Sequence, residues 1–269
     1  MTKPLLSKRL AGRRAVVAIW AGLSLGGCAR AEPRRRELTV FEAVSLVDAF
    51  ARLAKTFEAA NPGVAVVTHA AGSQQLRTQL EHGDHADVFA SADRKHMEAL
   101  VAEGLVTAPQ IFACNEPVVV VRIGLARPVV EFADLPRAER IVVGAPEVPI
   151  GSYTMRILDK AADKLGAEFR KRVEDRIVSR ELNVRQVLAK VVLGEADAGI
   201  VYRSDAVAAA DKVLVVQIPR DLEVVAEYPI AATRSAANPE LARRFIELAR
   251  SPAGVAALRG AGFVPCAGR

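Results

Sequence analysis

Two serines stand where a predicted strand gives way to a predicted helix, and both could donate hydrogen bonds to an anion. Ser45 follows the short apolar run at 38–41, and Ser73 follows the run at 64–68. A helix start offers backbone N–H groups without acceptors and the positive end of the helix dipole, and each serine adds a hydroxyl group. The alternative is that each serine only caps its own helix. Two such junctions in successive units favour an anion site without a countercharge.

A site built only from hydrogen-bond donors selects among anions. A fully deprotonated oxyanion such as sulfate or molybdate only accepts hydrogen bonds, so it suits such a site. Protonated phosphate carries an O–H group that would face donors and stay unpaired. The pattern therefore indicates a tetrahedral oxyanion that carries no proton.

The elements that must position these serines alternate between strand and helix. Strands are predicted at 38–41, 64–68 and 86–91, and helices at 46–61, 74–81 and 94–103, which is typical of a parallel sheet covered by helices. A second set follows, with strands at 117–122, 141–144, 199–202, 212–218 and 224–232 and helices at 154–165, 168–172, 184–194 and 239–258. We predict an α/β fold of two lobes that close over a ligand by hinge motion.

The first 27 residues have the composition of a signal peptide. Five basic residues precede an apolar stretch at 15–27 that is too short to span a bilayer. The run Leu25-Gly26-Gly27-Cys28 is typical of a lipobox and predicts lipidation of Cys28, with ordinary cleavage near Ala29 to Ala31 as the alternative. We expect a signal peptide at 1–27, a tether at 28–37 and a periplasmic or otherwise extracytoplasmic protein that meets the membrane only through its lipid anchor.

Charge and cysteine usage narrow the possible partners. The chain of 269 residues has a net charge of +6, but without the five basic residues of the signal segment it has 32 basic and 31 acidic residues. No basic patch is interleaved with aromatic residues, so we expect no nucleic-acid partner.

Cys114 and Cys266 could form a disulfide in an exported protein if the fold brings them together, which their spacing alone does not establish.

Six motifs in order resemble the molybdate-binding proteins of ABC importers. They are L-T-V-F-E-A-V-S-L at 38–46, A-G-S-Q-Q-L at 71–76, A-D-V-F-A-S-A-D at 86–93, P-E-V-P-I-G-S-Y at 146–153, N-V-R at 183–185 and G-I-V-Y-R-S-D-A at 199–206. Each motif is modest by itself, but six with matching order and spacing are specific. The resemblance extends from about Leu38 to Phe263.

This resemblance implies a fold, a ligand and partners. The fold would be the two-lobe, type II-like fold of periplasmic binding proteins, with one lobe at 38–114 plus 227–269 and the other at 115–226. The chain would be a monomer without enzymatic activity or cofactor that delivers molybdate or tungstate to an ABC permease and its ATPase. Carried over residue by residue, the ligand donors fall on Ser45, Ser73, Ile150, Val184 and Tyr202. Ile150 and Val184 would donate backbone N–H groups, and Tyr202 its phenolic hydroxyl.

Two residues depart from the family pattern. Ile150 is larger than the small residue common at its position, although a backbone donor tolerates this. Glu42 lies in a stretch that is commonly small and apolar, and a carboxylate aimed at a dianion would repel it. We therefore expect Glu42 to face away from the ligand.

Other functions have less support in the sequence. A periplasmic hydrolase would need a base near a nucleophile, and Ser73 lacks the G-x-S-x-G spacing. The cluster from Glu81 to Asp87 contains His82 and His85 but lies at a predicted helix end and turn, so we expect no bound metal cation. A sensor that signals through a partner is a further alternative, and the lipobox argues against it. The open alternative is a binding protein for another oxyanion such as sulfate.

Overall fold

A computed structural model describes residues 36–266, which form two five-stranded sheets with helices packed on them. The predicted signal segment, Cys28 and nearly all of the predicted tether lie outside these residues. Among the residues that are described, no helix is both long and apolar enough to cross a membrane.

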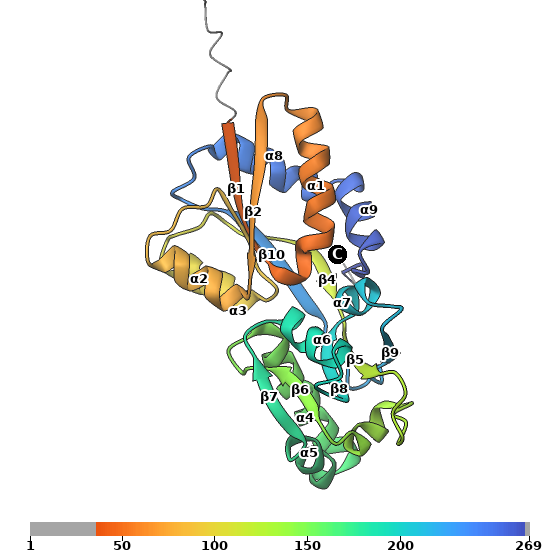
Figure 1. The fold of residues 1–269 in the computed structure, drawn as a ribbon. Helices are drawn as coiled ribbons and strands as arrows, with labels where there is room; N and C mark the ends of the chain where they lie inside the picture. Colours follow the sequence, from red (N-terminus) through yellow and green to blue (C-terminus); the bar gives the residue numbers. More distant parts are fainter. Residues whose placement is uncertain (1–35, 267–269) are drawn as a thin grey trace, which may run out of the picture. The chain divides into compact units, whose positions relative to one another are not determined.

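The first sheet is mainly parallel, with the return strand antiparallel to its neighbours. Its strands follow the order β2 (Val64–Ala71), β1 (Arg36–Ala43), β3 (Val88–Ala90), β10 (Ala226–Ala232) and β4 (Gln110–Asn115). One face is covered by α1 (Val47–Ala60), α8 (Pro239–Arg250) and α9 (Pro252–Gly260), and the other by α2 (Ser73–Glu81) and α3 (Arg94–Ala102) (Figure 1). Helix α1 ends within one residue of the predicted limit at 61, and Gly63, with a φ of 82°, lets the chain turn into β2.

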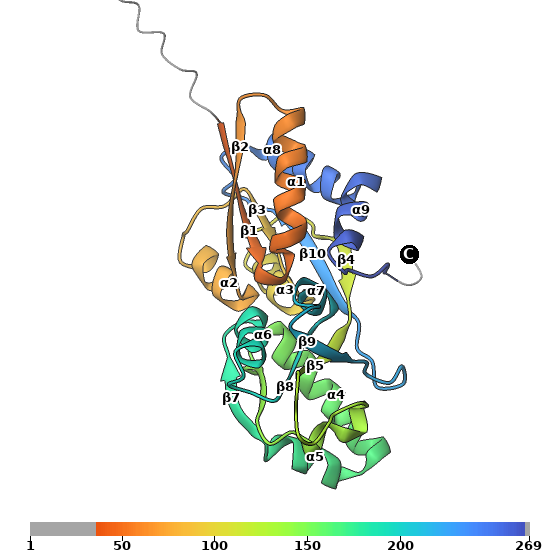
Figure 2. The ribbon, with the colours of Figure 1, turned by 45° about the vertical axis from the view of Figure 1, so that its right-hand side comes forward.

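The second sheet is mixed. Its strands follow the order β7 (Ile177–Glu181), β6 (Ile141–Gly144), β8 (Ala198–Tyr202), β5 (Pro117–Arg122) and β9 (Val213–Val216). The helices around it are η2 (Phe132–Arg137), α4 (Pro149–Leu165), α5 (Ala167–Glu174), α6 (Val184–Val192) and α7 (Arg203–Ala208) (Figure 2). Strand β5 is almost completely buried, as its run of four valines predicts.

Apolar packing links the two sheets. One cluster of buried side chains runs from β1 and β10 of the first sheet to β5, β6 and β8 of the second. On α1 and α8, Phe50, Phe57 and Phe245 pack edge to face, with ring centroids 5.4–5.7 Å apart. Buried side chains of the two sheets therefore form one continuous core.

The chain crosses between the sheets at two places. Strand β4 ends at Asn115 and β5 begins at Pro117, so Glu116 alone separates them. The return crossing lies between Val216, the last residue of β9, and Ala226, the first of β10. The two-lobe α/β fold is confirmed, while the lobe limits at 114/115 and 226/227 stay a prediction.

The sequence did not predict four of the elements described above, β4, β7, α7 and η2. Strand β4 follows a turn-rich stretch and has only a short apolar run at 111–114. Strand β7 lies at the edge of its sheet with exposed residues and presents no clear apolar run. Helix α7 begins directly after Tyr202 and is short. The structure also contains the Cys114–Cys266 disulfide, with Cα atoms 5.1 Å apart, which joins the end of β4 to the segment after α9.

Candidate functional site

All five predicted ligand donors lie at the starts of helices and are buried. Ser45 lies in the 3-10 turn η1 (Val44–Leu46) that leads into α1, and Ser73 is the first residue of α2. Ile150 is in the first turn of α4, Val184 begins α6, and Tyr202 directly precedes α7. Backbone N–H groups in a first helical turn have no acceptor within their helix. The five positions therefore offer donors of the kind that an anion accepts.

Neither serine caps its own helix, so the capping alternative is wrong for both. The hydroxyl oxygen of Ser73 accepts a hydrogen bond from the N–H of Ala92 at 2.9 Å. That oxygen is an acceptor there, which leaves the Ser73 hydroxyl hydrogen for another partner. The Ser45 hydroxyl lies 2.9 Å from the phenolic oxygen of Tyr228, which is on β10.

A close backbone approach brings the start of α2 to the start of α6. A Cβ atom on Gly72 would lie 2.7 Å from the carbonyl oxygen of Leu182, so a larger residue would push the two segments apart. The Gln74 side chain donates to the same carbonyl at 2.7 Å. Ser73 and Val184 are thereby held on facing segments of the two lobes.

A second close approach sets the start of α4. A Cβ atom on Gly151 would lie 1.9 Å from the carbonyl oxygen of Ala145, so only glycine lets the helix begin this close to the end of β6. The loop between them contacts the first lobe, since the ring Nε2 of buried His96 lies 2.9 Å from the carbonyl oxygen of Glu147. The N–H of Ile150 is placed by this tight turn.

Tyr202, the fifth predicted donor, lies in a cluster of three packed tyrosines. Tyr202 packs against Tyr153 of α4 and Tyr228 of β10, with ring centroids 6.3 and 5.8 Å apart. Tyr202 is 1% exposed, and its hydroxyl has no hydrogen-bond partner among the described residues. Burial raises the pKa of Tyr202 well above its usual range, so the phenol keeps its proton and stays a donor.

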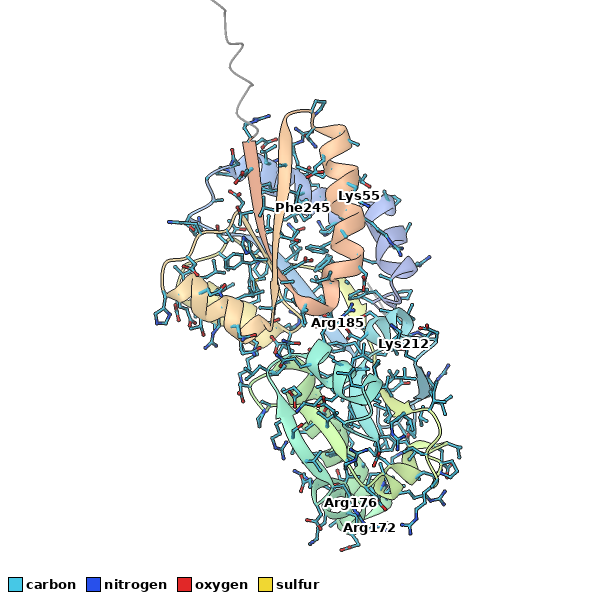
Figure 3. The ribbon with its side chains drawn as sticks, in the orientation of Figure 1. Lys55, Arg172, Arg176, Arg185, Lys212 and Phe245 are labelled. Atoms are coloured by element: carbon cyan, nitrogen blue, oxygen red, sulfur yellow. A yellow bond between two sulfur atoms is a disulfide. The ribbon has the colours of Figure 1, made fainter. Side chains whose placement is uncertain are left out.

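One arginine lies beside these helix starts. Arg185, labelled in Figure 3, follows Val184 on α6 and pairs with Asp48 of α1 at 2.6 Å and with Asp205 of α7 at 2.7 Å. Asp205 is fully buried, and burial raises its pKa to about 6 although the Arg185 charge opposes the rise. The charge of Arg185 is therefore balanced by carboxylates, and its pair with Asp48 joins the two lobes.

Glu42 is buried on β1, where its carboxyl hydrogen-bonds to the Thr68 side chain. Burial raises the pKa of Glu42 to about 8, against the lowering effect of that hydrogen bond. Most of the carboxyl is then protonated at neutral pH, which removes the repulsion that we expected toward a dianion. The prediction that Glu42 faces away from the ligand stays a prediction.

The metal alternative gains no support within residues 36–266. No group of three or more His, Cys, Asp or Glu side chains there could hold a metal ion. His82 instead binds the carbonyl oxygen of Thr78 in its own helix at 2.7 Å.

The sequence did not indicate that Tyr228 contacts the proposed site. Tyr228 meets Ser45 across 183 residues, and a single tyrosine in a predicted strand gives no sign of such a contact. Arg185 was part of a motif, but its two carboxylate partners were not predicted. The roles of the five predicted donors toward a ligand also stay predictions.

Comparison with known proteins gives consistent matches over this whole region. The family model for bacterial extracellular solute-binding proteins matches residues 38–264. The molybdate-binding protein ModA of Mycobacterium tuberculosis is 42% identical over 230 residues, which are 85% of this chain and 84% of that protein. A putative ABC transporter substrate-binding lipoprotein of Bacillus subtilis, YvgL, is 29% identical, covering 92% and 96% of the two chains. The periplasmic molybdate-binding protein of Azotobacter vinelandii superimposes with a TM-score of 0.73 at 25% identity, covering 85% and 99%.

The first prediction concerns Glu42. Its folded-state pKa of about 8 lies above the usual 4.5, so the folded state binds the proton more tightly than the unfolded state. The resulting stability is fully present below pH 4.5 and is lost as the pH rises toward 8. Relative to Glu42→Gln, the free energy of unfolding of the wild type should fall by about 1.4 kcal/mol per pH unit in this range. Urea unfolding from pH 5 to 8 measures it, and a pH-independent difference would contradict it.

The second prediction separates the two ion pairs of Arg185. Arg185→Met leaves buried Asp205 without its cation and should lower the free energy of unfolding by about 3 kcal/mol. Asp48→Asn removes only the exposed pair and should lower it by about 1 kcal/mol or less. Urea unfolding at pH 7 gives both values. The double variant Arg185→Met/Asp205→Asn is the control and should recover most of the loss, because no unpaired buried charge remains.

Proposed function

The chain belongs to the family of bacterial extracellular solute-binding proteins, and on that premise we propose that it captures molybdate or tungstate between its two lobes. The resemblance predicted from the six motifs is confirmed by the family match and by relatives named as molybdate-binding. Proteins of this family bind solutes rather than transform them. The proposed ligand donors are the hydroxyls of Ser45, Ser73 and Tyr202 and the backbone N–H groups at the starts of α4 and α6.

The observation that carries the proposal is the Tyr202 hydroxyl. It is buried, keeps its proton and has no acceptor among the described residues. An unpaired buried donor costs about 1–3 kcal/mol, so such groups are usually satisfied by a partner. An oxyanion bound beside Tyr202 would supply the missing acceptor. The Tyr202 ring is held in place for this contact by Tyr153 of α4 and Tyr228 of β10.

The balance of charge around the proposed site favours a dianion held by dipoles. Arg185 is neutralised by Asp48 and Asp205, so it offers no free cation to the ligand. Helix starts and hydroxyls stabilise negative charge and provide several donors in fixed positions. A ligand that only accepts hydrogen bonds satisfies every donor, whereas a protonated one leaves its own O–H unpaired.

Similarity favours molybdate over sulfate within this class of ligands. The relative that is 42% identical and the Azotobacter structure are both named for molybdate. Tungstate has the same charge and nearly the same size, so both ions belong to the proposal. Sulfate is also fully deprotonated and is the second candidate, because the donor-only shell suits it equally well.

Delivery to a transporter completes the proposed role. We infer that the protein acts outside the cytoplasm and hands its anion to an ABC permease driven by an ATPase. Lipidation of Cys28 would keep it beside that permease, and the similarity to a protein named as a lipoprotein supports this. The chain would act as a monomer without a cofactor.

Thermal unfolding with four anions tests the function. The protein without its first 27 residues is melted with molybdate, tungstate, sulfate or phosphate at equal concentration. A ligand at about 100 times its Kd adds about 2.7 kcal/mol, or on the order of 5–10 °C for a protein of this size. We expect molybdate and tungstate to raise the melting temperature, and sulfate and phosphate to leave it unchanged. A rise with sulfate alone would identify sulfate as the ligand in place of molybdate. No rise with any of the four anions, in protein that is folded and free of ligand, would contradict the oxyanion site.

Tyr202→Phe is the third prediction. Loss of the hydroxyl should weaken molybdate binding by about 1–3 kcal/mol, because one ligand oxygen loses its donor. Isothermal titration measures the change. Tyr153→Phe is the matched control, since it removes a hydroxyl from the neighbouring ring. An unchanged molybdate affinity in Tyr202→Phe would show that the Tyr202 hydroxyl does not bind the ligand.

A further inference from the structure

We propose that Gln74 and His96 are positioning residues that hold the two backbone donors of the second lobe within reach of the ion and so set its affinity. The inference rests on the proposed function and adds two residues outside the predicted ligand shell. Both lie on helices of the first lobe, and each hydrogen-bonds to a backbone carbonyl of the second lobe.

Gln74 reaches the segment that leads into α6. Its side-chain nitrogen donates to the carbonyl oxygen of Leu182 at 2.7 Å. Leu182 precedes Asn183, the cap of α6, which is followed by Val184 with its proposed donor N–H. The N–H of Leu182 donates to the Gln186 side chain of α6 at 3.1 Å. Leu182 is therefore bound to α6 through its N–H and to the first lobe through its carbonyl.

His96 makes a similar contact from α3. Its ring Nε2 lies 2.9 Å from the carbonyl oxygen of Glu147, in the loop between β6 and α4. A carbonyl oxygen only accepts hydrogen bonds, so Nε2 carries a hydrogen and is the donor. Glu147 is in the loop directly before α4, where Ile150 has the other proposed backbone donor. Each backbone donor of the second lobe thus follows closely after a carbonyl that a first-lobe side chain holds.

His96 has little freedom to move within the first lobe. It is almost completely buried, and its backbone N–H donates to the side chain of Asp93, the cap of α3, at 3.0 Å. The other side-chain oxygen of Asp93 lies 3.8 Å from Nε2, which is too long for a hydrogen bond. The hydrogen on Nε2 is therefore left to the carbonyl of Glu147.

The two held segments of the second lobe are also joined to each other. The N–H of Ala145 donates to the carbonyl oxygen of Glu181 at 2.9 Å, which links the loop before α4 to the segment before α6. The carbonyl of Ala145 accepts the N–H of Val148 at 2.9 Å and closes the turn that contains Glu147. The contacts of Gln74 and His96 therefore hold one connected part of the second lobe.

Holding this part in place matters because a small ion must be met from both lobes at once. The proposed serine hydroxyls belong to the first lobe, whereas the N–H groups of Ile150 and Val184 belong to the second. Without the two contacts, the ion itself has to bring the second-lobe donors into place, and this ordering reduces the net free energy of binding. Loss of one contact should therefore weaken binding by the value of about one hydrogen bond.

Isothermal titration with molybdate at pH 7 tests the inference. Gln74→Met and His96→Met each remove one donor and keep a side chain of similar size. We expect each variant to raise the Kd for molybdate about fivefold, the effect of one lost hydrogen bond. A Kd within about twofold of the wild-type value, in either variant as folded protein, would overturn the positioning role. Gln74 is only partly buried, so Gln74→Met decides the test if His96→Met fails to fold.

Two further variants show whether the hydrogen bond to the other lobe is responsible. His96→Gln keeps a side-chain N–H donor and should restore a Kd near that of the wild type. A Kd in His96→Gln as weak as in His96→Met would mean that the ring only fills space, and would overturn the role of His96. His82→Met is the matched control, because the His82 ring also bonds a backbone carbonyl, that of Thr78, but within its own helix. It should leave the Kd unchanged, and a fivefold rise there would contradict an effect specific to contacts between the lobes.

The wild type tells the two proposals apart. A folded, ligand-free wild type that binds none of the four anions would contradict the proposed function and this inference with it. A wild type that binds molybdate, together with an unchanged Kd in Gln74→Met or His96→Met, would contradict the positioning role alone. If the wild type binds sulfate in place of molybdate, the same titrations with sulfate apply, with the same expected fivefold rise.

Discussion

Buried donors without acceptors are the constraint on which the structure around the proposed site depends. Helices that begin at the ends of both sheets bring first-turn N–H groups and hydroxyls into the interior, and the Tyr202 hydroxyl remains unpaired among the described residues. The close approaches at Gly72 and Gly151 are needed to hold these helix starts in place. Such an arrangement lowers stability until an acceptor arrives, so the binding of an acceptor stabilises the folded state.

The charges of Arg185 and Glu42, which lie on or beside the helix starts, are both balanced or neutralised. The guanidinium of Arg185 is shared between an exposed and a fully buried carboxylate, and the Glu42 carboxyl holds its proton to about pH 8. A single strong cation would attract any anion with little regard for its protonation. Fixed dipoles and hydroxyls bind an anion well only where each hydrogen points to a ligand atom that accepts it. They therefore distinguish between anions more strictly than a cation does.

Much of this could be predicted from sequence, for physical reasons that also explain the gaps. The strand-to-helix junctions at Ser45 and Ser73 and the buried run of β5 have local signals, and the structure contains each of them. Strand β7 has no such signal, because an edge strand needs no continuous apolar run. The contact between Ser45 and Tyr228 and the disulfide between Cys114 and Cys266 join residues more than 150 positions apart, and only the folded chain reveals them.

The single-residue crossing at Glu116 has a consequence for kinetics. Asn115 comes just before this crossing and Pro117, whose φ is fixed by its ring, comes just after it, so the lobes can separate here only by a rotation that also disturbs Asn115. Because the proposed ligand donors come from both lobes, opening at this crossing would also loosen the hold on a captured ion. Changes in either crossing strand should therefore alter how long the ion stays bound more than how fast it binds, and the residence time sets how often a bound ion is still held when the protein meets its permease.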